Sequence, residues 1–255
     1  MKHLLFLFLF TSLSIAMPAQ SLKSLVNKSK SILQEGTKTN KSNSSSNNLV
    51  GSNLSNADIL DGLREALKVG TQNASGKLNK TNGFFTNQLI KILMPPEAKK
   101  IESTLRSFGF NKQCDNLILS MNRAAEDAAG QAVPIFVNAI MHMTINDGLS
   151  ILRGGNNAAT NFLKQATSSA LTTAFRPVIE NSLKKVDATK YWSDVFTTYN
   201  KLPITRNKVN TDLAGYVTER ALNGLFTTVA EEEANIRQNP SARVSGILQK
   251  VFGGK

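Results

Sequence analysis

Hydrophobic residues recur every three or four positions along residues 55–253, with polar residues between them. This spacing places the apolar side chains on one face of a helix, whereas no useful stretch alternates as a half-buried strand does. The pattern therefore predicts an all-α fold, a single globular multi-helix bundle of about eight or nine helices. The expected helices cover residues 55–74, 96–108, 112–129, 134–143, 145–152, 158–175, 189–200, 211–237 and 241–252.

Two of these helices begin with the spacing of a capping box. Ser55 precedes Asp58 by three residues, and Thr144 precedes Asp147 by three. In this arrangement the hydroxyl and the carboxylate each accept from the other residue's backbone N–H, so two unpaired amides are satisfied. We therefore expect the folded domain to begin near Ser55 and a second helix to begin after Thr144.

Other positions predict interruptions. Pro177 is expected to end one helix and restart the chain, because proline removes a helical hydrogen bond. Residues 89–94 are short and apolar, and predict either a helical turn or an extended piece. The helix that follows Pro96 is expected to stop at Gly109. Its predicted buried residues are Ile101, Leu105 and Phe108.

Residues 1–19 have the order of a secretory signal peptide. Lys2 and His3 precede an apolar run from Leu4 to Ile15, and small residues follow it. A bilayer-spanning helix needs about 20 apolar residues, which is more than this run supplies. We expect an exported, periplasmic protein. An uncleaved anchor, outer-membrane association and secretion are the alternatives.

Residues 20–36 are predicted to form a basic amphipathic arm that Gly36 can end. Such a helix can lie on an anionic membrane surface or dock on a partner. Folding back on its own domain, or having no fixed structure, are equally open. Residues 37–54 are rich in Asn, Ser and Lys and predict a flexible linker. The arm's key positions are Leu22, Lys23, Leu25, Val26, Lys28, Ile32 and Leu33.

The net charge of the chain indicates which class of partner it could bind. The chain has 30 basic and 18 acidic side chains, a formal net charge of +12. A basic surface attracts anionic partners, and for an exported protein a lipid or an envelope polymer is the expected one. Solubility alone also explains such a charge. Nucleic acid is not an expected partner, because the basic residues are dispersed and no aromatic stacking motif accompanies them.

The residue inventory excludes several chemistries. The chain has a single cysteine, Cys114, so it cannot form an intramolecular disulfide. His142 is the one histidine that follows the signal peptide, and we expect it to be partly buried and structural. A zinc site rich in nitrogen and sulfur is therefore excluded. Neither a phosphate-binding loop nor a nucleophile elbow is present. No metal and no cofactor are expected.

Carboxylates and arginines on two predicted helices form the candidate polar cluster. The alanine-rich segment 121–129 allows another helix to approach closely, which would partly bury Arg123 and Glu126 and require partners for them. Glu233 and Arg237 lie one helical turn apart and can pair. A structural ion network is one interpretation; catalysis in a shared cleft is the other. The candidate residues are Asn122, Arg123, Glu126, Asp147, Glu232, Glu233 and Arg237.

Several phrases occur together in a characteristic order. They are Asp61–Leu67, Met121–Glu126, Ile151–Gly154 with Ala158–Thr160, Ala221–Phe226, Glu232–Glu233, Ile236–Pro240 and Val251–Gly253. In this order they resemble the bacterial domain of unknown function 4197 family, over about residues 55–253. The resemblance implies an exported, mostly helical protein and assigns no catalytic residue.

Two hypotheses follow for the function. In the first, the chain is a non-enzymatic envelope protein whose helices enclose an apolar groove for a lipid or other hydrophobic ligand, or present a face to a protein partner. In the second, it is a hydrolase or lyase that uses Arg123, Glu126 and a glutamate of the run 231–233. The second requires that these side chains converge in one solvent-reachable cleft.

Overall fold

Eight α-helices and one short 3-10 helix make up the part of the chain that the structure, a computed structural model, describes: residues 55–201, 208–239, 242 and 249. No strand occurs in these ranges, and the all-α prediction is confirmed. The chain divides into two units, residues 1–49 and 50–255, and all described residues belong to the second. The predicted signal peptide, arm and linker lie outside the described residues, as does nearly all of the predicted helix 241–252.

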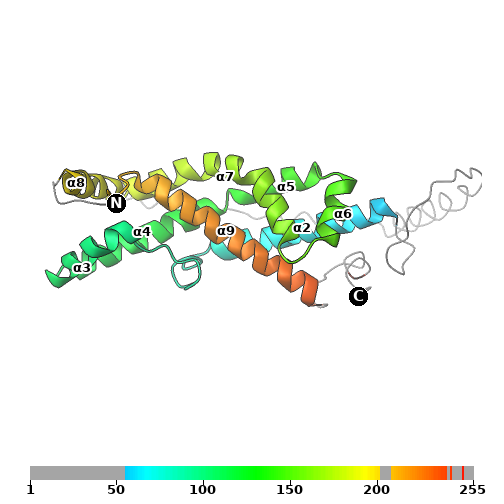
Figure 1. The fold of residues 1–255 in the computed structure, drawn as a ribbon, viewed down its shortest axis with the longest axis horizontal. Helices are drawn as coiled ribbons and strands as arrows, with labels where there is room; N and C mark the ends of the chain where they lie inside the picture. Colours follow the sequence, from blue (N-terminus) through cyan, green and yellow to red (C-terminus); the bar gives the residue numbers. More distant parts are fainter. Residues whose placement is uncertain (1–54, 202–207, 240–241, 243–248, 250–255) are drawn as a thin grey trace, which may run out of the picture. The chain divides into compact units, whose positions relative to one another are not determined.

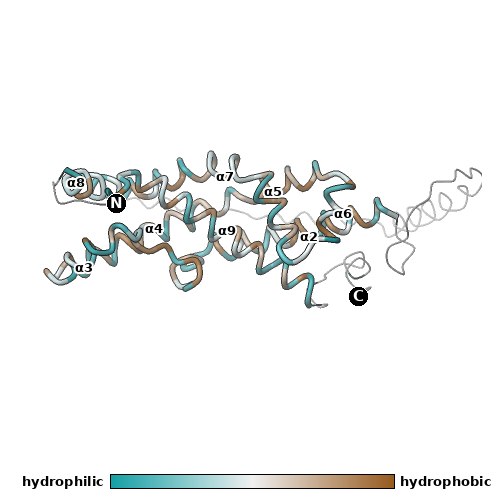
Figure 2. Tube along the Cα trace, viewed as in Figure 1, coloured by the Kyte–Doolittle hydropathy of each residue, from teal (hydrophilic) through white to brown (hydrophobic). Residues whose placement is uncertain are grey.

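The helices pack around two long central members, α7 and α9 (Figure 1). α9 contacts α2, α4, α7 and α8, and α7 also packs against α4 and α5. Hydrophobic and hydrophilic residues alternate along each helix (Figure 2), as amphipathic helices around a shared core require. The elements are α2 (Asn56–Leu78), η1 (Pro96–Ala98), α3 (Lys99–Ser107), α4 (Asn111–Ala129), α5 (Ala132–Met141), α6 (Ile145–Arg153), α7 (Ala158–Lys184), α8 (Ala188–Asn200) and α9 (Leu213–Gln238).

Small residues on α4 let the central helices approach one another. Ala124, Ala125, Ala128 and Ala129 are all fully buried, and α4 packs against α7 and α9. This confirms the close approach predicted from the alanine-rich segment. Larger side chains fill the rest of the core, among them Phe84, Phe136, Phe175, Leu163, Leu171 and Trp192.

Both predicted capping boxes are confirmed. The Ser55 hydroxyl accepts from the backbone N–H of Asp58, and the Asp58 carboxylate accepts from the N–H of Ser55. Thr144 and Asp147 repeat this reciprocal pair at the start of α6. The folded helices therefore begin where the local sequence chemistry places them.

Pro177 does not end a helix, contrary to prediction. α7 continues through it from Ala158 to Lys184. A proline inside a helix costs about 3 kcal/mol. Leu171 and Phe175 on one side and Ile179 and Leu183 on the other are fully buried, and this continuous apolar face offsets the cost.

Two predictions of burial are wrong, those for Phe108 and His142, and the other two residues predicted to be buried on α3, Ile101 and Leu105, are only partly buried. Phe108 is 75% exposed, because α3 ends at Ser107 and the chain reverses immediately at Gly109. His142 is exposed as well, at the C-terminal end of α5, where its Nδ1 lies 2.8 Å from the carbonyl of Asn138.

The segment 89–94 combines features of both predicted alternatives. Residues 88–90 form a turn in which the N–H groups of Ile90 and Lys91 donate to the carbonyl of Asn87. Residues 91–95 have no regular secondary structure.

Within the described ranges, no single helix is long and apolar enough to cross a membrane. Taken together, α5 and α6 reach that length and composition, but the chain bends by 106° between them.

Candidate functional site

Glu126 on α4 is a buried carboxylate that holds the loop between α2 and η1. Its Oε1 accepts from the backbone N–H groups of Phe84 and Phe85 at 3.1 and 3.2 Å. Its Oε2 accepts from the Arg123 guanidinium at 2.5 Å. Arg123 also donates to the side-chain oxygen of Asn82. The charge of Glu126 is thus satisfied by two amides and one cation, as a buried carboxylate requires.

Asn122 fastens the same loop one turn earlier on α4. Its side-chain oxygen accepts from the backbone N–H of Ile92 at 2.9 Å, and its side-chain nitrogen donates to the carbonyl of Ile92 at 2.8 Å. The Asn122 amide therefore satisfies both backbone polar groups of a residue that lies outside any helix. The side chain is fully buried, and all its bonds are to backbone groups.

Glu233 on α9 caps the start of α7. Its carboxylate accepts from the backbone N–H groups of Ala159 and Thr160 and from the Thr160 hydroxyl, at 2.8–3.1 Å. The N-cap residue of α7, Asn157, has a left-handed backbone and makes no side-chain cap. A carboxylate from another helix therefore satisfies the first amides of α7 and opposes the positive end of its dipole.

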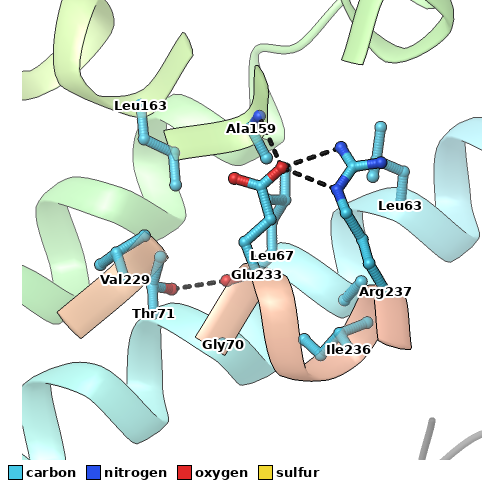
Figure 3. A pocket seen from close by; sticks show the side chains of 11 residues that line it. Leu63, Leu67, Gly70, Thr71, Ala159, Leu163, Val229, Glu233, Ile236 and Arg237 are labelled. Carbon is cyan, nitrogen blue, oxygen red and sulfur yellow. Dashed lines mark hydrogen bonds and ion pairs between the residues drawn. The ribbon is translucent and has the colours of Figure 1, made fainter. Parts of the chain in front are cut away.

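Arg237 completes this second group. Its guanidinium donates to Glu233 at 2.9 Å, which confirms the pair predicted from their spacing, and to the carbonyl of Ile151 near the end of α6 at 3.0 Å. The pair thus joins α9, the start of α7 and the end of α6. Figure 3 shows the Glu233 carboxylate between Ala159 and the Arg237 guanidinium. Next to it along the chain, Glu232 pairs with Lys77 and accepts from Asn73, both on α2. Glu231, the first of the run, is exposed.

Asp147 lies apart from both groups, in the cap of α6. Hydrogen bonds from the backbone N–H and the hydroxyl of Thr144 lower the pKa of its carboxyl group below the ordinary 3.8. Because the pKa of Asp147 is lower in the folded chain, its ionised carboxylate stabilises the fold at pH values above the ordinary pKa. This contribution is lost as the pH falls through the pKa of the folded state.

We therefore predict a pH-dependent effect of Asp147→Ala. Above about pH 5 the variant should unfold more easily, by up to about 1 kcal/mol, because it loses the carboxylate of the capping box and keeps only the Thr144 hydroxyl. The difference in stability between the variant and the native chain should narrow as the pH falls below the ordinary 3.8 and protonates Asp147 in the native chain. Thermal unfolding followed by circular dichroism across this range measures it. A difference that stays constant down to the lowest pH would contradict an ionised cap.

A small cavity adjoins Glu233 and Arg237. It lies between α2, α7 and α9, has a volume of about 30 Å³, and is lined by apolar side chains with Thr71 and the ion pair at its edge (Figure 3). That volume suits about one water molecule. Pockets for drug-sized ligands measure roughly 300–1,000 Å³. The cavity is thus too small for an acyl chain.

A larger depression runs between α7 and α9. It has a volume of about 280 Å³ and opens to solvent. Its lining is mixed, with hydroxyls and charges on α7 facing a glutamate, an asparagine and Phe226 on α9. The residues are Lys164, Ser168, Thr172, Arg176, Gly215, Thr218, Glu219, Leu222, Asn223 and Phe226. This lining differs from the carbon-walled chamber expected for an enclosed lipid.

The candidate residues therefore fall into separate groups with separate partners. Asn122, Arg123 and Glu126 hold the loop after α2, whereas Glu233 and Arg237 join α6, α7 and α9. No three or more His, Cys, Asp or Glu side chains gather as a metal site in the described ranges. Burial raises the pKa of the Cys114 thiol, which disfavours the reactive thiolate.

Comparison with known families agrees with the resemblance of the sequence. A family model described as "Protein of unknown function (DUF4197)" matches residues 53–253. The chain belongs to this family. The matched span covers every helix described here, so the two polar groups lie within the DUF4197 domain. No curated protein and no solved structure matches the chain.

Sequence reasoning missed the loop that the DUF4197 domain folds over α4. The segment around Phe84 breaks the helical pattern. The ring of Phe84 is nevertheless fully buried and contacts α9 at Gly224. The hydroxyl of Tyr216 on α9 donates to the carbonyl of Leu93, further along the same loop. The one available signal was the pair of aromatic residues in an otherwise polar stretch, which indicates burial without naming the partner.

Proposed function

We propose that this DUF4197 protein is a non-enzymatic protein of the cell envelope that binds a lipid or a protein partner through its outer surface. The observation that carries the proposal is that the buried carboxylates are fully hydrogen-bonded within the fold. Both oxygens of Glu233 and both oxygens of Glu126 accept hydrogen bonds from the fold itself. Carboxylates held in this way stabilise helix starts and loops.

The hydrolase or lyase alternative requires a different arrangement. A general acid or base must reach the proton it transfers, directly or through one water. Glu126 instead faces the amides of Phe84 and Phe85, and Glu233 faces the first amides of α7. The two carboxylates thus serve different segments, so we favour structural roles for both.

The packing supports binding at the surface over binding in an internal chamber. The cavity beside Glu233 holds about 30 Å³, and the depression between α7 and α9 has a mixed polar lining. Several large apolar side chains, by contrast, are exposed on the described surface. A partner that covers apolar side chains gains the free energy of removing them from water.

The test is crosslinking in the intact envelope, followed by native mass spectrometry with lipid extraction of the chain from about residue 20. We expect crosslinks to lipid or to one recurrent envelope protein, and no tightly enclosed ligand. A chain that crosslinks to neither, and purifies as a bare mass, contradicts the proposal. A stoichiometric apolar molecule that survives purification also contradicts it, because that result requires an internal chamber.

A further inference from the structure

One end of the helical bundle exposes aromatic side chains that the core does not use. The turn between α3 and α4 and the whole of α8 lie at this end (Figure 1). Phe108 in the turn is 75% exposed and Tyr191 on α8 is 65% exposed. Phe110, Val186 and Val195 also expose about half of their surface. These five residues define what we term the apolar tip.

The backbone fixes the two phenylalanines outward. Gly109 has a φ of 89°, and its N–H donates to the carbonyl of Arg106 while the N–H of Phe110 donates to that of Leu105. This pair of bonds is the Schellman motif that ends a helix with a left-handed residue. All the bonds lie within the turn itself. Phe108 and Phe110 are therefore held on either side of a rigid reversal.

On α8 the inner and outer faces are both apolar, but only one serves the core. Trp192 and Phe196 face inward and are buried, with ring centroids 4.2 Å apart, and the Trp192 Nε1–H donates to the carbonyl of Asn210. Tyr191 and Val195, one helical turn apart, face outward. The inner face thus anchors the helix, and the outer face is available to a partner.

The two segments that carry the apolar tip are basic. Residues 99–115 carry four basic and two acidic side chains, and residues 184–201 carry the same numbers, so each segment has a net charge of +2. The two acids of the first segment, Glu102 and Asp115, both pair with Arg106. Within these two segments, the exposed lysines without a carboxylate within 4 Å are Lys99, Lys100, Lys112, Lys185, Lys190 and Lys201. Elsewhere in the described residues, Lys68, Lys80, Lys164 and Lys208 are exposed in the same way.

We propose that the apolar tip docks on an anionic phospholipid bilayer. The inference rests on the proposed function, in that it names the surface and the partner class. Aromatic and aliphatic side chains enter the boundary between head groups and acyl chains, where tyrosine in particular places its ring in the apolar layer and its hydroxyl in water. The lysines of the two basic segments attract the anionic head groups. A protein partner would not require the positive charge of the two segments that carry these aromatics.

The first test measures flotation of the chain from about residue 20 with vesicles of phosphatidylglycerol and phosphatidylcholine, against phosphatidylcholine alone. We expect binding to the anionic vesicles, and weaker binding as salt rises, because the attraction between exposed charges is screened. Phe108→Ser with Phe110→Ser should bind at least about tenfold more weakly, from the lost burial of the rings. Lys112→Gln with Lys190→Gln should lower binding about fivefold per lysine.

Leu89→Ser is the matched control, because Leu89 is 80% exposed but lies in the loop after α2. It should bind as the native chain does. A thermal unfolding curve for each variant shows whether the fold is intact, as expected for these exposed positions. Equal binding by the phenylalanine variant and the native chain overturns the inference.

A second measurement uses fluorescence. The chain has a single tryptophan, Trp192, which is buried on the inner face of α8. Tyr191→Trp adds a second indole on the outer face, and vesicles that contain brominated acyl chains should quench the fluorescence that this variant gains over the native chain. Binding of the variant without quenching of this added fluorescence overturns the inference.

Further outcomes separate this inference from the proposed function. If Leu25→Ser with Ile32→Ser in the predicted arm abolishes binding and the phenylalanine variant does not, the arm is the membrane contact and the apolar tip is not. If no vesicle binds but one envelope protein crosslinks, the inference fails and the proposed function stands. If Phe108→Ser with Phe110→Ser instead dissociates a dimer in sedimentation velocity, the partner is a second copy of the chain, and the inference fails.

Discussion

Glu233→Ala is expected to lower the free energy of unfolding by about 3–5 kcal/mol, the cost of removing one partner of a buried ion pair. The substitution removes the acceptor of two backbone amides at the start of α7 and the carboxylate beside Arg237. Asn157, which occupies the N-cap position, does not cap the helix with its side chain. For a folded domain of this size the loss corresponds to a fall in Tm of about 10 °C.

Glu231→Ala is the matched control, because Glu231 lies on the same helix and is exposed. It should change stability by no more than about 0.5 kcal/mol. Glu233→Gln should fall between the two, since the amide keeps one acceptor oxygen and loses the charge. Urea unfolding measured by circular dichroism compares the three. If Glu233→Ala and Glu231→Ala are equally stable, the carboxylate does not hold α6, α7 and α9 together.

The role of Glu233 shows how far local sequence chemistry reaches. The pairing of Glu233 with Arg237 was predictable, because both lie on one helix at a spacing that fixes their neighbourhood. The amides of Ala159 and Thr160 are more than 70 residues away along the chain. Their contact depends on how α7 packs against α9, and one sequence does not encode that packing in any short pattern.

The same distinction explains the correct and incorrect helix predictions. Ser55 and Thr144 begin helices as predicted, because a capping box is satisfied entirely within four residues. At Pro177 the local rule was wrong, because burial of Phe175 and Ile179 on either side outweighs the lost hydrogen bond. Phe108 was assigned to the core by its helical spacing, although α3 ends one residue before it.

For the polar residues on α4, the sequence predicted that partners are needed but not which partners they are. An alanine-rich helix that carries Arg123 and Glu126 predicts that both side chains become partly buried and need partners; Glu126 is buried and Arg123 is partly buried. The partners are backbone amides of the loop after α2, a segment without periodicity that sequence patterns describe only as a break. Irregular segments of this kind obtain their conformation from tertiary contacts. The loss of stability when one such contact is removed by substitution measures how much the contact contributes.

Phe84→Ala is accordingly expected to cost about 3–5 kcal/mol, the range for removing a buried phenylalanine ring. The ring is fully buried, and it lies so close to α9 that a Cβ atom at Gly224 would be 2.6 Å from its Cε1 atom. Phe85→Ala is the control. Phe85 is partly buried, and its ring contacts the Lys91 ammonium 4.1 Å from the centroid, so its loss should cost only about 1 kcal/mol.

A double-mutant cycle tests whether Phe84 acts through Gly224. Gly224→Ala alone should destabilise the native chain by about 1–3 kcal/mol, because the added methyl group overlaps the ring. In the Phe84→Ala background the same methyl group enters the space that the ring vacated, so the double variant should be more stable than the sum of the single effects predicts. Additive losses in urea unfolding would show that the loop is held by Asn122 and Glu126 on α4, and that contact with α9 contributes little to its position.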